Sequence, residues 1–167
     1  MYDESKRFAE SATHSYITTH NLNGSIARIF NTYGPNMQID DGRVVTNFIY
    51  QALKGKEITI YGNGEQTRSF SYIDDTLDGI LKIIHYEKSD VFNIGNDNEV
   101  TIKYLAEKII ELTNSNSKIV YHELPINDPK QRKPDLTKAK ELLNYKPKTS
   151  LEDGLKLTID WISANYK

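Results

Sequence analysis

A tyrosine and a lysine near the start of the chain have the spacing needed for proton transfer. Tyr2 and Lys6 are separated by four positions, so on a helix they lie on one face. An ammonium group beside a phenol favours the phenolate and lowers the phenol pKa from about 10. Such a pair can act as a general base towards an alcohol. A solvated first helical turn would show the same spacing, so the spacing alone leaves both interpretations open.

The five arginines are the next candidates, because the other basic residues are all lysines. They are Arg7, Arg28, Arg43, Arg68 and Arg132, in a chain that has 21 lysines and arginines together. A planar guanidinium can bind phosphate or carboxylate through two parallel hydrogen bonds, which an ammonium group cannot. Each arginine is therefore a candidate for contact with an anion.

Two of these arginines lie in polar stretches that could bind an anion. Arg43 and Asn47 are one helical turn apart at the start of an expected helix, where free backbone N–H groups attract negative charge. Arg132 lies between Lys130 and Lys133 in a proline-rich loop. Solvated surface charge is the alternative interpretation of both stretches.

Two further groups of residues follow expected strands. Asn31 and Thr32 come directly after the strand expected at residues 25–30, and open α/β sheets bind ligands at the carboxyl ends of their strands. Tyr61 and Arg68 flank a Gly-Asn-Gly turn, so an aromatic ring and a guanidinium could meet at a nucleotide. The alternative at Asn31 is a capped strand end, and the Gly-Asn-Gly turn itself is predicted to be a hairpin turn, because its spacing is not that of a dinucleotide-binding loop.

Helices and short strands alternate along the chain. Helices are expected at residues 3–20, 44–53, 74–86, 101–112, 137–144 and 150–164, with caps at Asp74 or Asp75, Thr101 and Ser150. Strands are expected at residues 25–30, 57–61, 69–72, 91–94 and 118–121. This order predicts an α/β fold with parallel strands, because the crossovers are long enough. The continuous apolar residues at 25–30 predict a buried strand.

Composition argues against several other functions. The 167 residues suit one domain, or one domain and a fragment of another. The net charge of −2 provides no basic field for nucleic acid, and the lack of cysteine excludes thiolate zinc sites and cysteine nucleophiles. The four histidines have no metal-ligand spacing, and no apolar run approaches the length of about 18 residues that spans a membrane. No apolar signal core is visible at the start, so a cytoplasmic protein is expected.

Taken together, the motifs resemble the extended short-chain dehydrogenase/reductase superfamily of nucleotide-sugar enzymes. Residues 2–6, 28–35 and 61–75 are similar to its Tyr-x-x-x-Lys, strand-end and substrate-domain motifs. Residues 40–49 and 128–135 most resemble UDP-glucuronate decarboxylases (UDP-xylose synthases). Sugar 4,6-dehydratases share the general pattern but not these two stretches. The Gly-rich NAD loop of the superfamily has no counterpart in the sequence.

The resemblance implies a fold in two parts. Residues 1–35 would be the remnant of a dinucleotide-binding domain, the carboxyl-terminal part of a Rossmann-like parallel sheet without its amino-terminal NAD-binding half. Residues 36–167 would form mainly a smaller α/β substrate-binding domain for the nucleotide sugar. Part of residues 70–95 would return to the Rossmann layer.

The resemblance also implies a role for each motif residue. Tyr2 would be the general base and Lys6 would lower its pKa, and both would contact NAD together with Thr32. The residues that would bind the UDP-sugar are Asn31, Arg43, Asn47, Tyr61, Arg68 and Arg132.

The implied reaction is redox-neutral. NAD⁺ would take hydride from C4 of UDP-glucuronate, and the resulting β-keto acid would lose CO₂ because the ketone accepts the electron pair. NADH would then return hydride to C4 to give UDP-xylose. The cofactor supplies the redox chemistry, whereas the protein supplies orientation and a tuned base.

Two hypotheses follow for this chain. It is the carboxyl-terminal portion of a decarboxylase that needs a complementing amino-terminal half, because Tyr2 lies at a fraying terminus and the strand edge near residues 25–30 is open. Alternatively, it is a non-catalytic remnant that binds a nucleotide sugar or dimerises. A homodimer through the helix at residues 3–20 is expected from the family. A related 4,6-dehydratase or epimerase and a plain α/β interaction domain are further alternatives.

Overall fold

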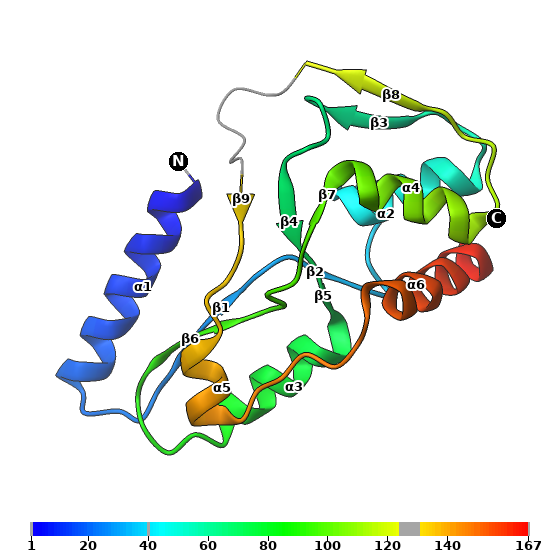
Figure 1. Cartoon of the computed structure of the whole chain (residues 1–167). Helices are drawn as coiled ribbons and strands as arrows, with labels where there is room; N and C mark the ends of the chain where they lie inside the picture. Colours follow the sequence, from blue (N-terminus) through cyan, green and yellow to red (C-terminus); the bar gives the residue numbers. More distant parts are fainter. Residues whose placement is uncertain (1, 40, 124–130, 167) are drawn as a thin grey trace.

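The fold consists of helices and short strands that alternate along the chain (Figure 1). The computed structural model describes residues 2–39, 41–123 and 131–166. The helices are α1 (Tyr2–Thr19), α2 (Val44–Leu53), α3 (Ile73–Ile84), α4 (Ile102–Thr113), α5 (Thr137–Leu143) and α6 (Leu151–Asn165). The strands are β1 (Ile26–Ile29), β2 (Thr32–Tyr33), β3 (Ile58–Tyr61), β4 (Thr67–Ser69), β5 (Ser71–Tyr72), β6 (Val91–Ile94), β7 (Glu99–Thr101), β8 (Ile119–His122) and β9 (Gln131–Arg132). The α/β class predicted from the sequence is confirmed.

The strands pair mainly in parallel, as the long crossovers predict. Strand β1 pairs with β6, β2 with β5, and β3 with β8, all in parallel. Strand β4 lies between β7, which runs antiparallel to it, and β9, which runs parallel to it. Segments that are far apart in the sequence therefore meet in each sheet.

Strand β1 is parallel as expected, but the prediction that it is buried is wrong. Ala27, Arg28 and Ile29 are all exposed. Within the described part of the chain β1 pairs only with β6, so its second edge is open, in agreement with the expected open edge. Its apolar residues therefore lack the neighbouring strand and helix that would cover them.

The prediction of a hairpin at the Gly-Asn-Gly turn is also wrong. Strands β3 and β4 on either side of the turn belong to different sheets. Ile58 and Ile60 of β3 are fully buried in the core, and this strand pairs with β8 instead. Gly62 and Gly64 have φ angles of 76° and 80°, which favour glycine, so the turn can redirect the chain into the second sheet.

The caps of α4 and α6 match the sequence analysis. The Thr101 side chain accepts a hydrogen bond from the Tyr104 N–H at 3.0 Å, and Ser150 Oγ accepts one from the Asp153 N–H at 3.1 Å. Each bond satisfies one of the free N–H groups in the first helical turn.

The predicted cap of α3 by Asp74 or Asp75 is wrong. Helix α3 begins at Ile73, and its N-cap residue, Tyr72, makes no side-chain capping bond. The buried Asp75 carboxylate instead accepts hydrogen bonds from the N–H groups of Lys148 and Thr149, both at 3.0 Å. It therefore attaches the segment before α6 to the first turn of α3.

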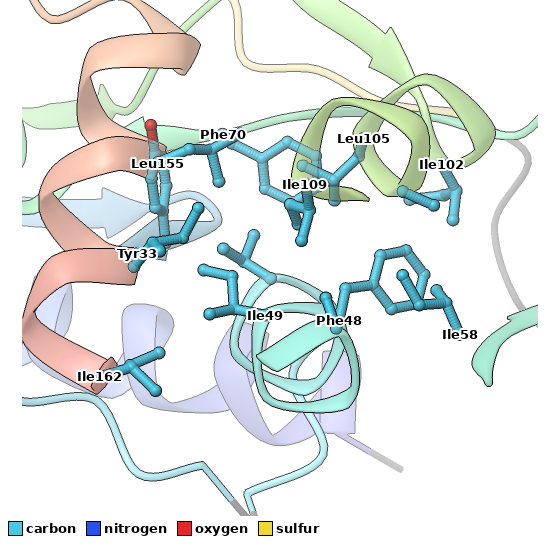
Figure 2. Packing of buried hydrophobic residues seen from close by; sticks show 14 of the residues in the cluster. Tyr33, Phe48, Ile49, Ile58, Phe70, Ile102, Leu105, Ile109, Leu155 and Ile162 are labelled. Atoms are coloured by element: carbon cyan, nitrogen blue, oxygen red, sulfur yellow. The ribbon is translucent and has the colours of Figure 1, made fainter. Parts of the chain in front are cut away.

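The larger hydrophobic core lies between helices α2, α4 and α6 (Figure 2). Phe48 and Ile49 of α2 pack in one cluster with Leu105 and Ile109 of α4. Leu155 of α6 belongs to the same cluster. A second cluster joins β6, α3 and α5. Its buried members are Ile83, Phe92, Ile94, Leu136, Ala139, Leu143 and Tyr145.

Close packing of α6 against two tyrosines depends on Gly154. A Cβ at this position would overlap the Tyr33 hydroxyl and lie 3.0 Å from Tyr72 Cδ2. Alanine normally favours a helix over glycine by about 1 kcal/mol, but overpacking of a core costs about 1 to 3 kcal/mol. We therefore expect Gly154→Ala to lower the free energy of unfolding in urea, whereas the exposed Ser163→Ala in the same helix leaves it unchanged or raises it slightly. Equal effects of the two changes would contradict the close contact.

Helix α1 lies at one edge of the molecule, apart from α2, α4 and α6 (Figure 1). Nearly all of its residues are exposed. It is joined to the strand that follows it by hydrogen bonds from the Arg28 guanidinium to the Glu10 carboxylate, one of them 2.8 Å long. Ile17 packs near Gly24. None of the described helices is long and apolar enough to cross a membrane.

Candidate active site

A pocket of about 280 Å³ lies between the start of α2 and strands β2, β3 and β4. We call it the central pocket. Residues from separate sequence motifs line it, and they include Asn31, Thr32, Arg43, Asn47, Tyr61 and Arg68. The structure thus brings together every residue expected to bind the UDP-sugar except Arg132. The volume is close to the lower end of the usual range for ligand sites, about 300 Å³.

Arg68 is a buried guanidinium in the wall of this pocket. Its residue is only 9% exposed, and Nη1 donates a hydrogen bond to the Thr67 carbonyl at 2.8 Å. Burial and fixed geometry suit this guanidinium to bind a phosphate or carboxylate.

Arg132 is held beside Arg68 by the pairing of the sheet. The two residues are register partners in the parallel strands β4 and β9, so their side chains leave the same face of the sheet. The Arg132 side chain is exposed, and no hydrogen bond or ion pair joins it to any other residue that the structure describes. The two arginines that the sequence places 64 positions apart are therefore neighbours.

The start of α2 adds a second source of positive potential. Its N-cap residue, Arg43, has extended backbone angles and makes no side-chain capping bond, so the N–H groups of the first turn keep no side-chain partner at the cap. Arg43 Nε lies 3.0 Å from Asp41 Oδ2, which neutralises part of its charge. Asn47 lies one turn along the same face and also lines the central pocket.

Asn31 and Thr32 take part in hydrogen bonds within the fold. Asn31 Nδ2 donates to the Ser69 carbonyl at 3.3 Å. Thr32 Oγ1 donates to the Phe30 carbonyl at 2.9 Å and lies 3.0 Å from Thr76 Oγ1. The single proton of the Thr32 hydroxyl is directed to the Phe30 carbonyl or to Thr76 Oγ1, so towards a ligand this hydroxyl acts as an acceptor.

Tyr61 presents an aromatic ring at the end of β3. It is 49% exposed, and its ring lies 6.0 Å from the ring of His122 on the paired strand β8. One side of the Tyr61 phenol is therefore supported by a neighbour while the residue lines the central pocket.

Lys6, the lysine of the proposed proton-transfer pair, does not reach the central pocket. Lys6 lies exposed in the first turns of α1 and is not among the residues that line the pocket. The Tyr2 backbone begins α1, but its side chain lies outside the described part of the structure, as do residue 40 and residues 128–130 of the two decarboxylase-like stretches. The Tyr2 and Lys6 assignment stays a prediction.

Several lining residues escaped the sequence analysis. Gln66, Phe70 and Met37 all line the central pocket, and Gln66 Nε2 donates to the Tyr61 carbonyl at 2.6 Å. Gln66 lies between Tyr61 and Arg68 in the sequence, and this position could have indicated that it lines the same pocket. The Tyr33 hydroxyl donates to the Leu151 carbonyl at 3.2 Å, and burial raises the Tyr33 pKa far above its ordinary value, so this phenol stays neutral.

No group of three or more histidine, aspartate or glutamate side chains that could hold a metal ion occurs among the described residues. The polar groups of the central pocket are guanidinium, amide and hydroxyl groups instead. These groups bind anions and sugar hydroxyls by charge and hydrogen bonds.

Solved structures of nucleotide-sugar epimerases share this fold. A UDP-glucose 4-epimerase from Thermotoga maritima superimposes with a TM-score of 0.93 at 32% identity, over 97% of this chain and 53% of that one. A UDP-glucuronic acid 4-epimerase from Bacillus cereus, solved in complex with UDP-glucuronic acid and NAD, gives 0.87 at 32% identity, over 94% of this chain and 50% of that one. The fold is thus that of the Rossmann-like extended short-chain dehydrogenases/reductases.

Among the relatives most similar to this chain in sequence are UDP-glucuronic acid decarboxylases. UDP-glucuronic acid decarboxylase 5 of Arabidopsis thaliana is 50% identical over 93% of this chain and 46% of its own length. UDP-glucuronic acid decarboxylase 1 of Xenopus tropicalis is 44% identical over 96% of this chain and 38% of its own length. The family model described as GDP-mannose 4,6 dehydratase matches residues 1–158, so the chain belongs to this family. The resemblance to UDP-glucuronate decarboxylases is confirmed, and the chain spans less than half the length of these relatives.

Proposed function

We propose that this chain is the UDP-sugar-binding portion of an NAD-dependent UDP-glucuronate decarboxylase. The complete reaction would be C4 oxidation, CO₂ loss and re-reduction to UDP-xylose. The observation that carries the proposal is the central pocket, where Asn31, Arg43, Asn47, Tyr61 and Arg68 converge from distant parts of the sequence. The division into a dinucleotide-binding remnant at residues 1–35 and a substrate domain belongs to the same proposal.

The charges of the site suit a nucleoside diphosphate. Arg68 and its register partner Arg132 provide two guanidiniums for the diphosphate, and the start of α2 adds the positive end of a helix. The half-exposed ring of Tyr61 provides a flat surface for the uracil or ribose. Asn31 and Asn47 provide amide groups for the hydroxyls of the sugar.

NAD would supply the hydride acceptor and donor for this reaction. The residues of this chain fit one part of that cofactor only. Thr32 Oγ1, at the start of β2, has two lone pairs, and the contact with Thr76 Oγ1 uses at most one of them. Lys6 offers an ammonium group on α1, and both groups are suited to ribose hydroxyls. Tyr2, as the phenolate, would accept the proton of the sugar C4 hydroxyl.

A complementing amino-terminal half is supported by an exposed apolar surface. Leu77, Leu81 and Ile84 form a stripe along α3 and are 48%, 55% and 69% exposed. Ile29, on the open edge of β1, is 54% exposed, and α3 contacts β1. A further α/β unit that extends the sheet at β1 would cover both features.

A homodimer through α1 is the other proposed assembly. Phe8 and Tyr16 are 76% and 61% exposed on this helix and would be buried by a second copy. The expected cytoplasmic location stays a prediction, which fractionation of the source cells would test.

Binding and turnover test the proposal separately. We expect calorimetry to detect UDP binding to the chain, with no comparable binding of ADP. We expect UDP-xylose to form from UDP-glucuronate only when the amino-terminal half of a UDP-glucuronate decarboxylase is added with NAD⁺. Failure to bind UDP would contradict the proposal and favour an interaction domain.

A non-catalytic nucleotide-sugar-binding remnant is the second candidate. It is favoured because Lys6 is not among the described residues that line the central pocket, and α1 lies apart from α2, whose start forms one side of that pocket (Figure 1). It predicts UDP binding with no turnover after any amino-terminal half is added. The same pair of measurements therefore distinguishes the two functions.

A further inference from the structure

We propose that Glu99 is a positioning residue whose carboxylate holds strand β9 against β4 and thereby keeps Arg132 beside Arg68. The inference rests on the proposed function, in which these two arginines bind the diphosphate of a UDP-sugar. It adds a residue that no sequence motif indicated and that does not line the central pocket.

Strand β9 has little support of its own. Within the described part of the chain it comprises Gln131 and Arg132, and both residues are exposed. Its backbone pairs with Thr67 and Arg68 of β4 at the edge of the three-stranded sheet. Two residues of parallel pairing are a weak attachment, because an isolated strand pair this short is not stable in water.

The Glu99 carboxylate joins β9 to the rest of the sheet through side-chain hydrogen bonds. It accepts a hydrogen bond from Thr67 Oγ1 at 2.8 Å, and Gln131 Nε2 lies 2.8 and 2.9 Å from its two oxygens. Lys133 Nζ lies 3.7 Å from Glu99 Oε2. One side chain on β7 thus reaches across the central strand β4 and binds the side chains of β9 and the residue after it.

This contact lies on the opposite face of the sheet from the two arginines. Glu99 is the register partner of Ser69, so it shares a face with Ser69 and Thr67, whereas Arg68 faces the other way. Gln131 likewise shares the Thr67 face. A change at Glu99 therefore leaves the pocket wall intact and acts on Arg132 only through the position of β9.

A carboxylate suits this position better than an amide. Both oxygens accept hydrogen bonds, and the Glu99 side chain is only 20% exposed. The hydrogen bonds from Gln131 and Thr67 and the nearby Lys133 charge hold the Glu99 pKa below its ordinary value, so the group is ionised at neutral pH. An amide has one acceptor oxygen and would place its NH₂ group against Gln131 or Thr67.

The affinity for UDP tests the functional consequence by calorimetry. We expect Glu99→Ala to weaken binding by about three- to tenfold in the wild-type chain and to have no further effect in an Arg132→Ala background. The exchanged pair Glu99→Gln with Gln131→Glu keeps one carboxylate between β7 and β9, and we expect it to restore most of the affinity. The matched control is Glu107→Ala, an exposed glutamate on α4, which should bind UDP normally.

Hydrogen exchange without any ligand tests the attachment itself. We expect the backbone amides of residues 131–133 to exchange about tenfold faster in Glu99→Ala, with the α2 and α4 amides unchanged. Unchanged exchange at β9, or equal losses of affinity with and without Arg132, would overturn the inference. If the wild-type chain fails to bind UDP, the proposed function is wrong, while the exchange result still decides whether Glu99 holds β9.

Discussion

Replacement of Arg68 by glutamine is expected to weaken UDP binding by at least about 30-fold. A buried guanidinium at the centre of a site contributes about 2 kcal/mol or more, which corresponds to this factor. Arg68 meets that description because it is only 9% exposed and lies in the wall of the central pocket. Calorimetric titration with UDP measures the effect, after thermal unfolding has shown that the variant is folded.

The control for Arg68→Gln is Lys54→Gln. It removes the same charge at the C-cap of α2, the end of that helix remote from the pocket. Because surface charges farther apart than about 8 Å are largely screened at physiological salt, we expect a change of less than about twofold. Equal losses in both variants would mean that UDP responds to net charge alone and that Arg68 makes no specific contact.

Asp75→Ala is expected to lower the free energy of unfolding by about 2 to 4 kcal/mol. The change removes two hydrogen bonds from backbone N–H groups to a buried carboxylate, and a hydrogen bond to a charged group contributes about 1.5 to 3 kcal/mol. Lys148 is exposed and Thr149 is half-buried, so water can replace part of this loss. Urea denaturation followed by circular dichroism measures the loss. Asp75→Asn should give a smaller loss, because one amide oxygen can still accept one of the two bonds.

The neighbouring Asp74 provides the matched control. It lies in the same first turn of α3, but it is exposed. We expect Asp74→Ala to cost only about 0.3 to 1 kcal/mol, through the lost interaction of its charge with the helix dipole. A loss for Asp74→Ala as large as that for Asp75→Ala would contradict the role of Asp75 in holding the segment before α6.

Long periodic helices could be predicted from the sequence, because their apolar residues repeat along one face. Helix α2 has the predicted bounds, and Thr101 and Ser150 cap helices as expected. Strands β2, β7 and β9 were missed, since two or three residues carry no detectable period. They exist because partners far along the chain supply their hydrogen bonds.

The site was predictable where its residues form motifs and unpredictable where they act through the fold. Arg43, Tyr61 and Arg68 were identified from local patterns, and the structure places them in one pocket. The adjacency of Arg68 and Arg132 and the reach of Glu99 across β4 depend on strand register, which a sequence without pairing information does not contain.

The long separation between paired strands has a consequence for synthesis of the chain. Ile26 pairs with Val91, 65 positions later, and Thr67 pairs with Gln131, 64 positions later. At translation rates of 5–20 residues per second, the interval between synthesis of the earlier strand and of its partner is about 3 to 13 s. During that time the apolar edge of β1 is free to pair with another nascent chain, so we infer that chaperone contact early in translation would favour correct assembly.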